Sequence, residues 1–173
     1  IKPTPNIGGV GLINDYQNMI TMDFKTTGNS VYVIGKTEGQ LDQSVFARDL
    51  LSEKKGPPPN INLFNEKNIG ENILNLISAK MCIKGNKGIK INQLKGLINK
   101  FEYFFGEDQG RYIIEITSEN VKKVNEILEK NSVHYDELGI VDDEILMYNN
   151  DIKLPIDELQ EVHKYWLEKY MDS

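Results

Sequence analysis

The stretch 111–141 constrains the fold most, because it predicts a strand, a helix and a second strand in direct succession. Residues 111–116 and 133–141 are rich in β-branched and aromatic side chains, as strands are. We expect Ser118 to cap the helix between them and Asn131 to end it in a left-handed conformation. The helix carries an apolar stripe at helical spacing, made by Val121, Val124, Ile127 and Leu128. A strand–helix–strand return of this kind favours an α+β sandwich that is partly ferredoxin-like.

More strands and helices are predicted before this unit. Alternation and glycine-bounded apolar runs indicate strands at residues 10–13, 19–24, 30–35 and 90–91. Helical spacing indicates helices at residues 45–51, 66–78 and 93–101. Ser44 is expected to cap the first of these, with Phe46, Leu50 and Leu51 on its apolar face. The prolines at 57–59 require an extended connection.

A hairpin and a last helix are predicted after it. Residues 145–147 and 152–154 form the expected hairpin, which turns at Asn149 and Asn150. Pro155 suits the first position of the final helix. The buried stripe expected along that helix consists of Ile156, Leu159, Val162, Trp166 and Tyr170.

Composition excludes several classes of function. The 173 residues suffice for one domain with a proper core, and the net charge of −6 argues against nucleic-acid binding. No apolar run approaches the ~20 residues that span a bilayer. The single cysteine, Cys82, cannot form an internal disulfide, so we expect a reducing, cytoplasmic location. No Cys/His spacing predicts a metal site.

Charge is distributed unevenly along the chain. Between Glu71 and Glu102 there is no acid, whereas acids dominate after His134. The basic stretch contains Lys80, Lys84, Lys87, Lys90, Lys95 and Lys100. A face for a phosphorylated ligand and a solvated surface both explain these lysines, and we favour the solvated surface. The acidic residues 142–144 lack the ligand alternation of a calcium loop, so we expect a solvated turn.

The loop at residues 105–112 is the best candidate for a ligand site. Two glycines bracket two carboxylates and an amide, and an arginine follows. Gln109 could donate and accept, Arg111 could bind phosphate or carboxylate, and Glu107 or Asp108 could bind a hydroxyl or Mg²⁺. A tight turn with a local Glu107–Arg111 ion pair explains the same residues equally well.

The first residues combine two prolines with three glycines and a short apolar run. We interpret residues 10–13 as a strand whose neighbour lies upstream, and we expect the chain to be a piece of a larger enzyme. The glycines are not a phosphate loop, because no Gly-Lys-Ser/Thr ending and no helix follow them.

Four segments, in a fixed order, carry a family resemblance: Pro3-Thr4-Pro5-x-Ile7-Gly8-Gly9-Val10-Gly11-Leu12-Ile13-x-Asp15, Val31-Tyr32-Val33-Ile34-Gly35-x-Thr37, Gly56-x-Pro58-Pro59 and Phe105-Gly106-Glu107-x-Gln109-Gly110-Arg111-Tyr112. They resemble the C-terminal part of the formylglycinamidine ribonucleotide synthase (PurL) family of purine biosynthesis. The resemblance covers nearly the whole chain.

The resemblance implies the fold of the C-terminal domain of aminoimidazole ribonucleotide synthetase (PurM), with a leading strand. Residues 1–27 would end a second nucleotide-binding subdomain and its linker, and residues 28–173 would form the PurM-like domain. The full enzyme would use ATP and Mg²⁺ to convert formylglycinamide ribonucleotide and glutamine-derived ammonia into formylglycinamidine ribonucleotide, ADP and phosphate. Its expected partners are the upstream lobes of the same polypeptide and a glutaminase domain or subunit.

The resemblance also implies where chemistry lies. The catalytic histidine and the Mg²⁺ ligands of the family precede this chain, which would therefore hold no catalytic residue, bind no metal and be inactive alone. Its expected ligand-binding residues, at an auxiliary site, are Glu107, Asp108, Gln109 and Arg111.

Three positions depart from the family pattern. Asp42 and Gln43 stand where glycines are usual, and Asp108 stands where a small polar residue such as serine is common. The family also has an Asp-x-Ser-Asp-Gly-Gly turn between the segments marked here by Ile77 and Met81. Either the turn is truly deleted or a mobile loop is left out of the sequence. We favour the second explanation, with further residues near 77–79, because a deletion would orphan backbone groups in a packed layer.

Three other interpretations remain open at this point, one of which is a purely structural interaction domain that binds no ligand. The chain resembles the equivalent domain of sister enzymes, aminoimidazole ribonucleotide synthetase and selenophosphate synthetase. The strand–helix–strand return is also similar to ACT-like domains that bind amino acids, which would make the chain a regulatory module.

Overall fold

The computed structural model describes residues 8, 10–12, 15, 16, 21, 23–53, 55–76, 86–92, 99–149 and 151–171, with the backbone alone at 71–76, 163 and 166–170. Strands and helices mix along the described chain in this order: β1 (Ser30–Ile34), α1 (Val45–Asp49), α2 (Leu63–Leu76), β2 (Gly88–Ile91), α3 (Lys100–Phe105), β3 (Tyr112–Ile116), α4 (Val121–Lys130), β4 (Tyr135–Asp142), β5 (Ile145–Tyr148), β6 (Ile152–Pro155) and α5 (Ile156–Met171).

One six-stranded sheet organises the molecule, in the order β3-β1-β4-β2-β5-β6. β1 lies antiparallel to both β3 and β4, so the unit β3-α4-β4 returns with β1 between its strands. This is the split return expected of a ferredoxin-like sandwich. β2 pairs antiparallel with β4 and parallel with β5, and β6 closes the hairpin with β5. The predicted α+β class is confirmed.

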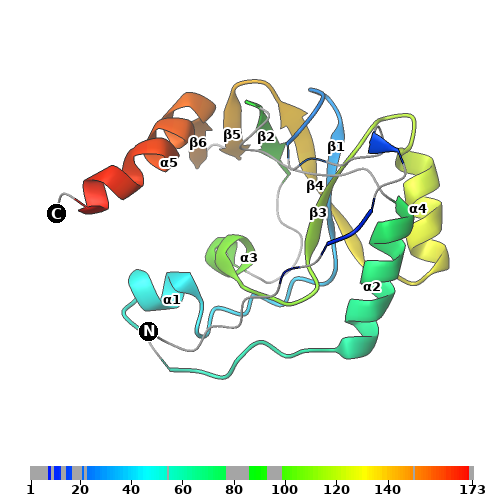
Figure 1. Ribbon diagram of the computed structural model, residues 1–173, viewed down its shortest axis with the longest axis horizontal. Coiled ribbons are helices and arrows are strands. Elements are labelled where there is room, and N and C mark those ends of the chain that lie inside the picture. The colour runs from blue at the N-terminus through cyan, green and yellow to red at the C-terminus, as the bar shows by residue number, and fades with distance from the viewer. Residues whose placement is uncertain are drawn as a thin grey trace.

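Both faces of the sheet are covered, by different segments. Figure 1 shows α2 and α4 side by side on one side of the sheet, whereas α5 extends away beyond β6. The core under α2 and α4 joins alternate residues of β1 and β3 to the two helices: Tyr32, Ile34, Ile69, Ile114, Ile116, Val124, Leu128 and Val133. The opposite face holds a second core: Phe24, Val31, Val33, Ile89, Leu138 and Val141. The alternation along β1 follows from the two-residue period of a strand.

A buried carboxylate connects residues 25–29 to the edge strand β3. Glu115 on β3 is 8% exposed and accepts the backbone N–H groups of Lys25 and Thr26 at 2.7 and 3.0 Å. The side-chain amide of Asn29 donates to the same carboxylate at 2.6 Å. These contacts place Phe24 in the second core, on the N-terminal side of the boundary expected between residues 27 and 28.

Most predicted elements are confirmed, with shifts at their ends. Ser44 caps α1 by accepting the N–H of Ala47 at 3.1 Å, as expected. The helix predicted from residue 66 begins at Leu63, and Pro155 ends β6 immediately before α5 begins. The helix predicted over 93–101 overlaps α3 at two positions, since α3 runs from Lys100 and residues 93–98 lie outside the description.

Several local expectations are wrong, and one is not tested. Residues 10–12 are exposed and pair with no described strand; the strand expected there needs a neighbour upstream of this chain, so it stays a prediction. Leu50 and Leu51 are 70% and 51% exposed, and Ala47 is the buried residue of α1. Val162, expected in the buried stripe of α5, is 65% exposed.

The ends of α4 also differ from the prediction. Asn120, not Ser118, occupies the N-cap, and no side chain caps it. Asn131 has a φ of −95°, and the left-handed conformation falls to Ser132 at +54°. The carboxamide of Asn131 instead donates to the carbonyl of Ile127 at 2.8 Å, so it satisfies the helix end from its side chain.

Candidate functional site

Asp108 connects the predicted site loop to the segment that follows β1. Its carboxylate accepts three consecutive backbone N–H groups, from Glu38, Gly39 and Gln40, at 3.1, 3.0 and 3.0 Å. The side chain of Asp108 is 7% exposed. Successive N–H groups that converge on one anion form a nest, and here the anion is supplied by the protein itself. Asp108 is therefore an anchor between two loops rather than a free ligand for Mg²⁺.

Glu107 and Arg111 are also engaged within the protein. The carboxylate of Glu107 accepts the N–H of Val45 at 2.8 Å, at the first residue of α1. The guanidinium of Arg111 lies 3.5 Å from Asp108 and donates to the carbonyl oxygens of Tyr103 and Gly106, each at 3.3 Å. The expected Glu107–Arg111 ion pair is not the one that forms, because Arg111 turns back toward α3 and pairs with Asp108.

Two glycine contacts explain why these loops can lie together. A Cβ atom on Gly35 would stand 2.1 Å from the carbonyl oxygen of Gly110, and Gly35 has a φ of +98°. A Cβ on Gly106 would stand 3.1 Å from the Cα of Gly39. Residues 35–40 and 106–110 thus touch backbone to backbone, which side chains at these positions would prevent.

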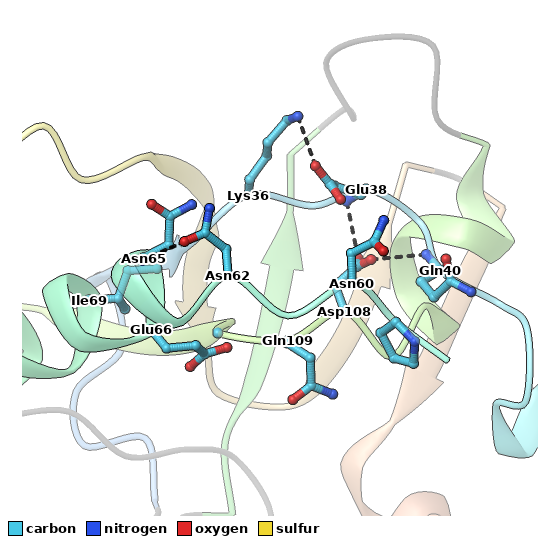
Figure 2. Close-up of a pocket in the computed structure, with 12 residues that line it drawn as sticks. Lys36, Glu38, Gln40, Asn60, Asn62, Asn65, Glu66, Ile69, Asp108 and Gln109 are labelled. Carbon is cyan, nitrogen blue, oxygen red and sulfur yellow. Dashed lines mark hydrogen bonds and ion pairs between the residues drawn. The ribbon is translucent and has the colours of Figure 1, made fainter. Parts of the chain in front are cut away.

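A pocket of about 290 Å³ opens between these loops and the start of α2. The two loops contribute Lys36, Glu38, Gln40, Asp108, Gln109 and Gly110. The other wall precedes and begins α2, and it contributes Pro59, Asn60, Asn62, Asn65, Glu66 and Ile69. Figure 2 shows this arrangement, with the ammonium of Lys36 reaching the carboxylate of Glu38, 2.9 Å away. Of the four predicted site residues, Asp108 and Gln109 line the pocket.

Residues 59–69 were missed by the sequence reasoning as part of a site. The prolines at 57–59 predicted an extended segment, but no local pattern showed that it lies beside the loop at 105–111. Asn62 accepts the N–H of Asn65 at 3.0 Å and so caps α2. The density of asparagine between residues 60 and 65 was the available signal, because amides favour caps and can also contact ligands.

The basic stretch pairs with the acidic one. Lys87 lies 2.6 Å from Asp143, and Lys90 lies 2.6 Å from Asp142. The N–H groups of Glu144 and Ile145 also donate to Asp142. The contact with Lys90 and these N–H groups lower the pKa of Asp142 below its usual value, against the opposing effect of burial. Lys87 and Lys90 therefore pair with the acidic residues where β4 turns into β5.

Elsewhere the described residues show little that suggests chemistry. Among them, no group of three His, Cys, Asp or Glu side chains could hold a metal ion. His134 is exposed and lies 3.1 Å from Asp136. Burial raises the pKa of Tyr103, whose ring lies beside the guanidinium of Arg111. Cys82 and the turn expected near residues 77–79 lie outside the described residues. No described helix is long and apolar enough to cross a bilayer.

Several curated proteins are similar to this chain over nearly its whole length. The chain is 55% identical over 192 aligned positions to phosphoribosylformylglycinamidine synthase subunit PurL of Pelagibacter ubique, and the match covers 100% of the chain. PurL of Bartonella henselae is 32% identical over 190 positions and 99% of the chain. The chain spans 26% of the length of each of these relatives. No family model matches.

Solved structures give the same fold. Thermotoga maritima PurL complexed with FGAR matches with a TM-score of 0.66 at 20% identity, over 83% of this chain and 30% of that one. Thermotoga maritima PurL complexed with ATP matches with a TM-score of 0.59 at 17% identity, over 83% of this chain and 27% of that one. The sheet and helices described above are thus an arrangement also found in part of a larger protein.

Proposed function

The chain belongs to the PurL family of phosphoribosylformylglycinamidine synthase subunits, and from this premise we propose that it is the C-terminal part of such an enzyme. The complete polypeptide would convert formylglycinamide ribonucleotide, glutamine-derived ammonia and ATP into formylglycinamidine ribonucleotide, ADP and phosphate. The observation that carries the proposal is the 55% identity to one PurL over 100% of the chain.

Residues 28–173 would be the PurM-like domain of the second half, and residues 1–27 would end the preceding nucleotide-binding subdomain. The six-stranded sheet supports the first assignment. Phe24, packed in the second core, favours a boundary slightly earlier than residue 27. The aligned length of 192 positions exceeds the 173 residues of the chain, so the relative carries positions that this chain lacks, as a gap near 77–79 would require.

This segment alone would be inactive. A ligase of this class needs groups that bind ATP, hold Mg²⁺ and transfer protons. In the predicted loop, Asp108, Glu107 and Arg111 are already engaged in internal contacts. The residues present do not fit a resident Mg²⁺ site, since the described part holds no cluster of three ligands. We therefore assign ATP, Mg²⁺ and catalysis to the upstream lobes.

An apolar surface on α1 and α3 supports contact with those upstream lobes. We call it the α1–α3 patch: Val45, Phe46, Phe101 and Phe105. Phe46 stacks on Phe105 with ring centres 4.8 Å apart, and Phe101 lies 5.7 Å away. Val45, Phe101 and Phe105 are nevertheless 54%, 49% and 47% exposed. Aromatic clusters of this kind usually lie in interfaces.

The remaining parts of the proposal concern ammonia, location and the loop. A glutaminase domain or subunit would supply ammonia, and the word "subunit" in the relatives' name is consistent with that. We propose a cytoplasmic location. Of the four residues expected at the auxiliary ligand site, Gln109 would contact the ligand in the pocket, while Glu107, Asp108 and Arg111 would position the loop.

A chimeric enzyme tests the function directly. The segment of Pelagibacter ubique PurL that aligns with this chain is replaced by the 173 residues, in one version with the relative's extra positions kept. We expect ATP hydrolysis that depends on formylglycinamide ribonucleotide and ammonium in the chimera, and none with the 173-residue chain alone. The proposal fails if a folded chimera that keeps the extra positions is inactive, or if the isolated chain turns over substrate.

A further inference from the structure

We propose that the pocket between the two loops and the start of α2 binds the vicinal diol of a ribosyl compound, with Glu66 and Gln109 as its principal contacts. The inference rests on the auxiliary ligand site proposed above and names the class of ligand that this site would take, and its test does not need an active synthase. A space of about 290 Å³ suits one sugar ring or a small nucleoside rather than a large ligand.

The geometry of Glu66 depends on Gly110. A Cβ on Gly110 would lie 2.9 Å from one carboxylate oxygen of Glu66, so the glycine leaves room for this carboxylate beside the loop. Figure 2 shows that the Glu66 carboxylate, from the start of α2, and the Gln109 carboxamide, from the loop at 105–111, point in the same direction. Ile69, which is 8% exposed, lies one helical turn further along α2 and gives the pocket an apolar wall.

The polar groups of the pocket divide into engaged and available ones. Asp108 is engaged by three N–H groups, and Glu38 by Lys36. The side-chain amide of Gln40 donates to the carbonyl of Pro57 at 3.3 Å. In the described part of the chain, no hydrogen bond engages the side chains of Glu66 and Gln109. A carboxylate and a carboxamide are therefore available on one side of the pocket.

Their chemistry selects for hydroxyl groups. A carboxylate has two oxygens that accept hydrogen bonds, so it can take one from each hydroxyl of a vicinal diol, as acidic residues do with ribose in dinucleotide sites. The carboxamide of Gln109 can donate to a hydroxyl oxygen and accept from its hydrogen. Three carboxylates against one ammonium line the pocket, which disfavours a phosphate there.

Isothermal titration of the 173-residue chain tests the ligand class. The probes are adenosine, 2′-deoxyadenosine, D-ribose and the cationic amine agmatine. We expect adenosine to bind at least roughly tenfold more tightly than 2′-deoxyadenosine, since one hydrogen bond to a charged group is lost. Binding of D-ribose would show that the sugar suffices. Equal binding of both nucleosides, binding of agmatine alone, or no binding overturns the proposal.

Variants locate the site. Glu66→Gln keeps the shape of the side chain and should weaken adenosine binding roughly tenfold, and Gln109→Ala should weaken it about threefold. Glu126→Gln, on the exposed face of α4, is the matched control and should leave binding unchanged. Circular dichroism confirms that each variant is folded. Unchanged affinity in both pocket variants would overturn the assignment, and this outcome is independent of whether the chimeric synthase is active.

Discussion

At the scale of single residues, Asp108 shows how a side chain that looks like a ligand can be structural. It satisfies three N–H groups of residues 38–40 and the guanidinium of Arg111. Charged hydrogen bonds of this kind are strong, and removing the acceptor leaves the partly buried N–H groups of Gly39 and Gln40 without this partner. The loop at 105–111 therefore depends on this carboxylate for its position.

Asp108→Ala should accordingly lower the free energy of unfolding by about 2–4 kcal/mol, measured by urea denaturation. The matched control is Asp136→Ala. Asp136 is a 42%-exposed carboxylate that pairs with His134, and its loss should cost less than about 1 kcal/mol. Equal effects of the two variants would contradict the anchoring role of Asp108.

The sequence alone located this loop but not what its residues do. The spacing of Glu107, Asp108 and Arg111 showed polar groups at a turn, and that much is confirmed. Their partners at residues 38–45 are more than sixty positions away, so no local pattern could reveal them. The same holds for Glu66, which reaches Gly110 through the packing of α2 against the sheet.

Asp142 gives a dependence on pH with a defined sign. Its pKa is lowered in the folded protein, mainly by Lys90, so its stabilisation is present above the ordinary value of 3.8 and is lost as pH falls through the folded value. Asp142→Asn should lose about 1 kcal/mol near neutral pH. The difference from the unaltered chain should shrink below pH 3.8, as urea denaturation at a series of pH values would show. A difference that grows toward acid would contradict this sign.

At the scale of elements, the contacts that position strands and loops relative to one another lie at the ends of the elements. Gly35 ends β1 with its N–H bonded to the carbonyl of His134 at 2.8 Å and with the carbonyl of Gly110 against its Cα. Its φ of +98° is costly for any other residue. Gly35 therefore contacts both His134, beside β4, and the loop at 105–111, and a side chain at this position would separate the loop from the sheet.

Gly35→Ala should therefore destabilise the chain by more than about 3 kcal/mol or prevent folding, because strain in the backbone adds to a clash with backbone atoms. Gly28→Ala is a useful control. Gly28 also has a positive φ, +89°, but a Cβ at this position would meet nothing within 4 Å. Thermal melting of both variants separates the cost of the clash from that of the strain. Similar melting temperatures would show that the close approach to Gly110 is unimportant.

The elements that the sequence predicted well are those that form because of a local residue pattern. β1 is short, β-branched and bounded by glycine, and α4 has a stripe whose Val124 and Leu128 are buried as expected. The burial predictions that were wrong depend on where a helix ends, which the apolar spacing alone does not show. Leu50 and Leu51 continue an apolar spacing but lie beyond Asp49, where α1 ends, so helical periodicity no longer directs them inward.

At the scale of the whole molecule, topology was predictable in class but not in detail. The strand–helix–strand return implied a split sheet, and β3-β1-β4 is such an arrangement. The parallel pairing of β2 with β5 had no sequence signal, because it joins segments more than fifty residues apart. The close approach of these two strands instead requires Gly88 in β2, where a Cβ would stand 2.0 Å from the carbonyl oxygen of Ile145 in β5.

The α1–α3 patch leads to a prediction about assembly rather than stability. Phe101 is 49% exposed, so Phe101→Glu should change the free energy of unfolding of the 173-residue chain by less than about 1 kcal/mol. In the chimeric PurL the same change would bury a charge against an upstream lobe, and a buried unpaired charge is strongly unfavourable. We expect roughly tenfold or greater loss of synthase activity.

Lys123→Glu, on the exposed side of α4, is the charge-changing control and should leave activity near that of the parent chimera. Analytical ultracentrifugation and limited proteolysis of the chimeras would show whether the Phe101 variant loosens the contact between lobes. A Phe101→Glu chimera that is as active and as protease-resistant as its parent would mean that the patch faces water in the complete enzyme.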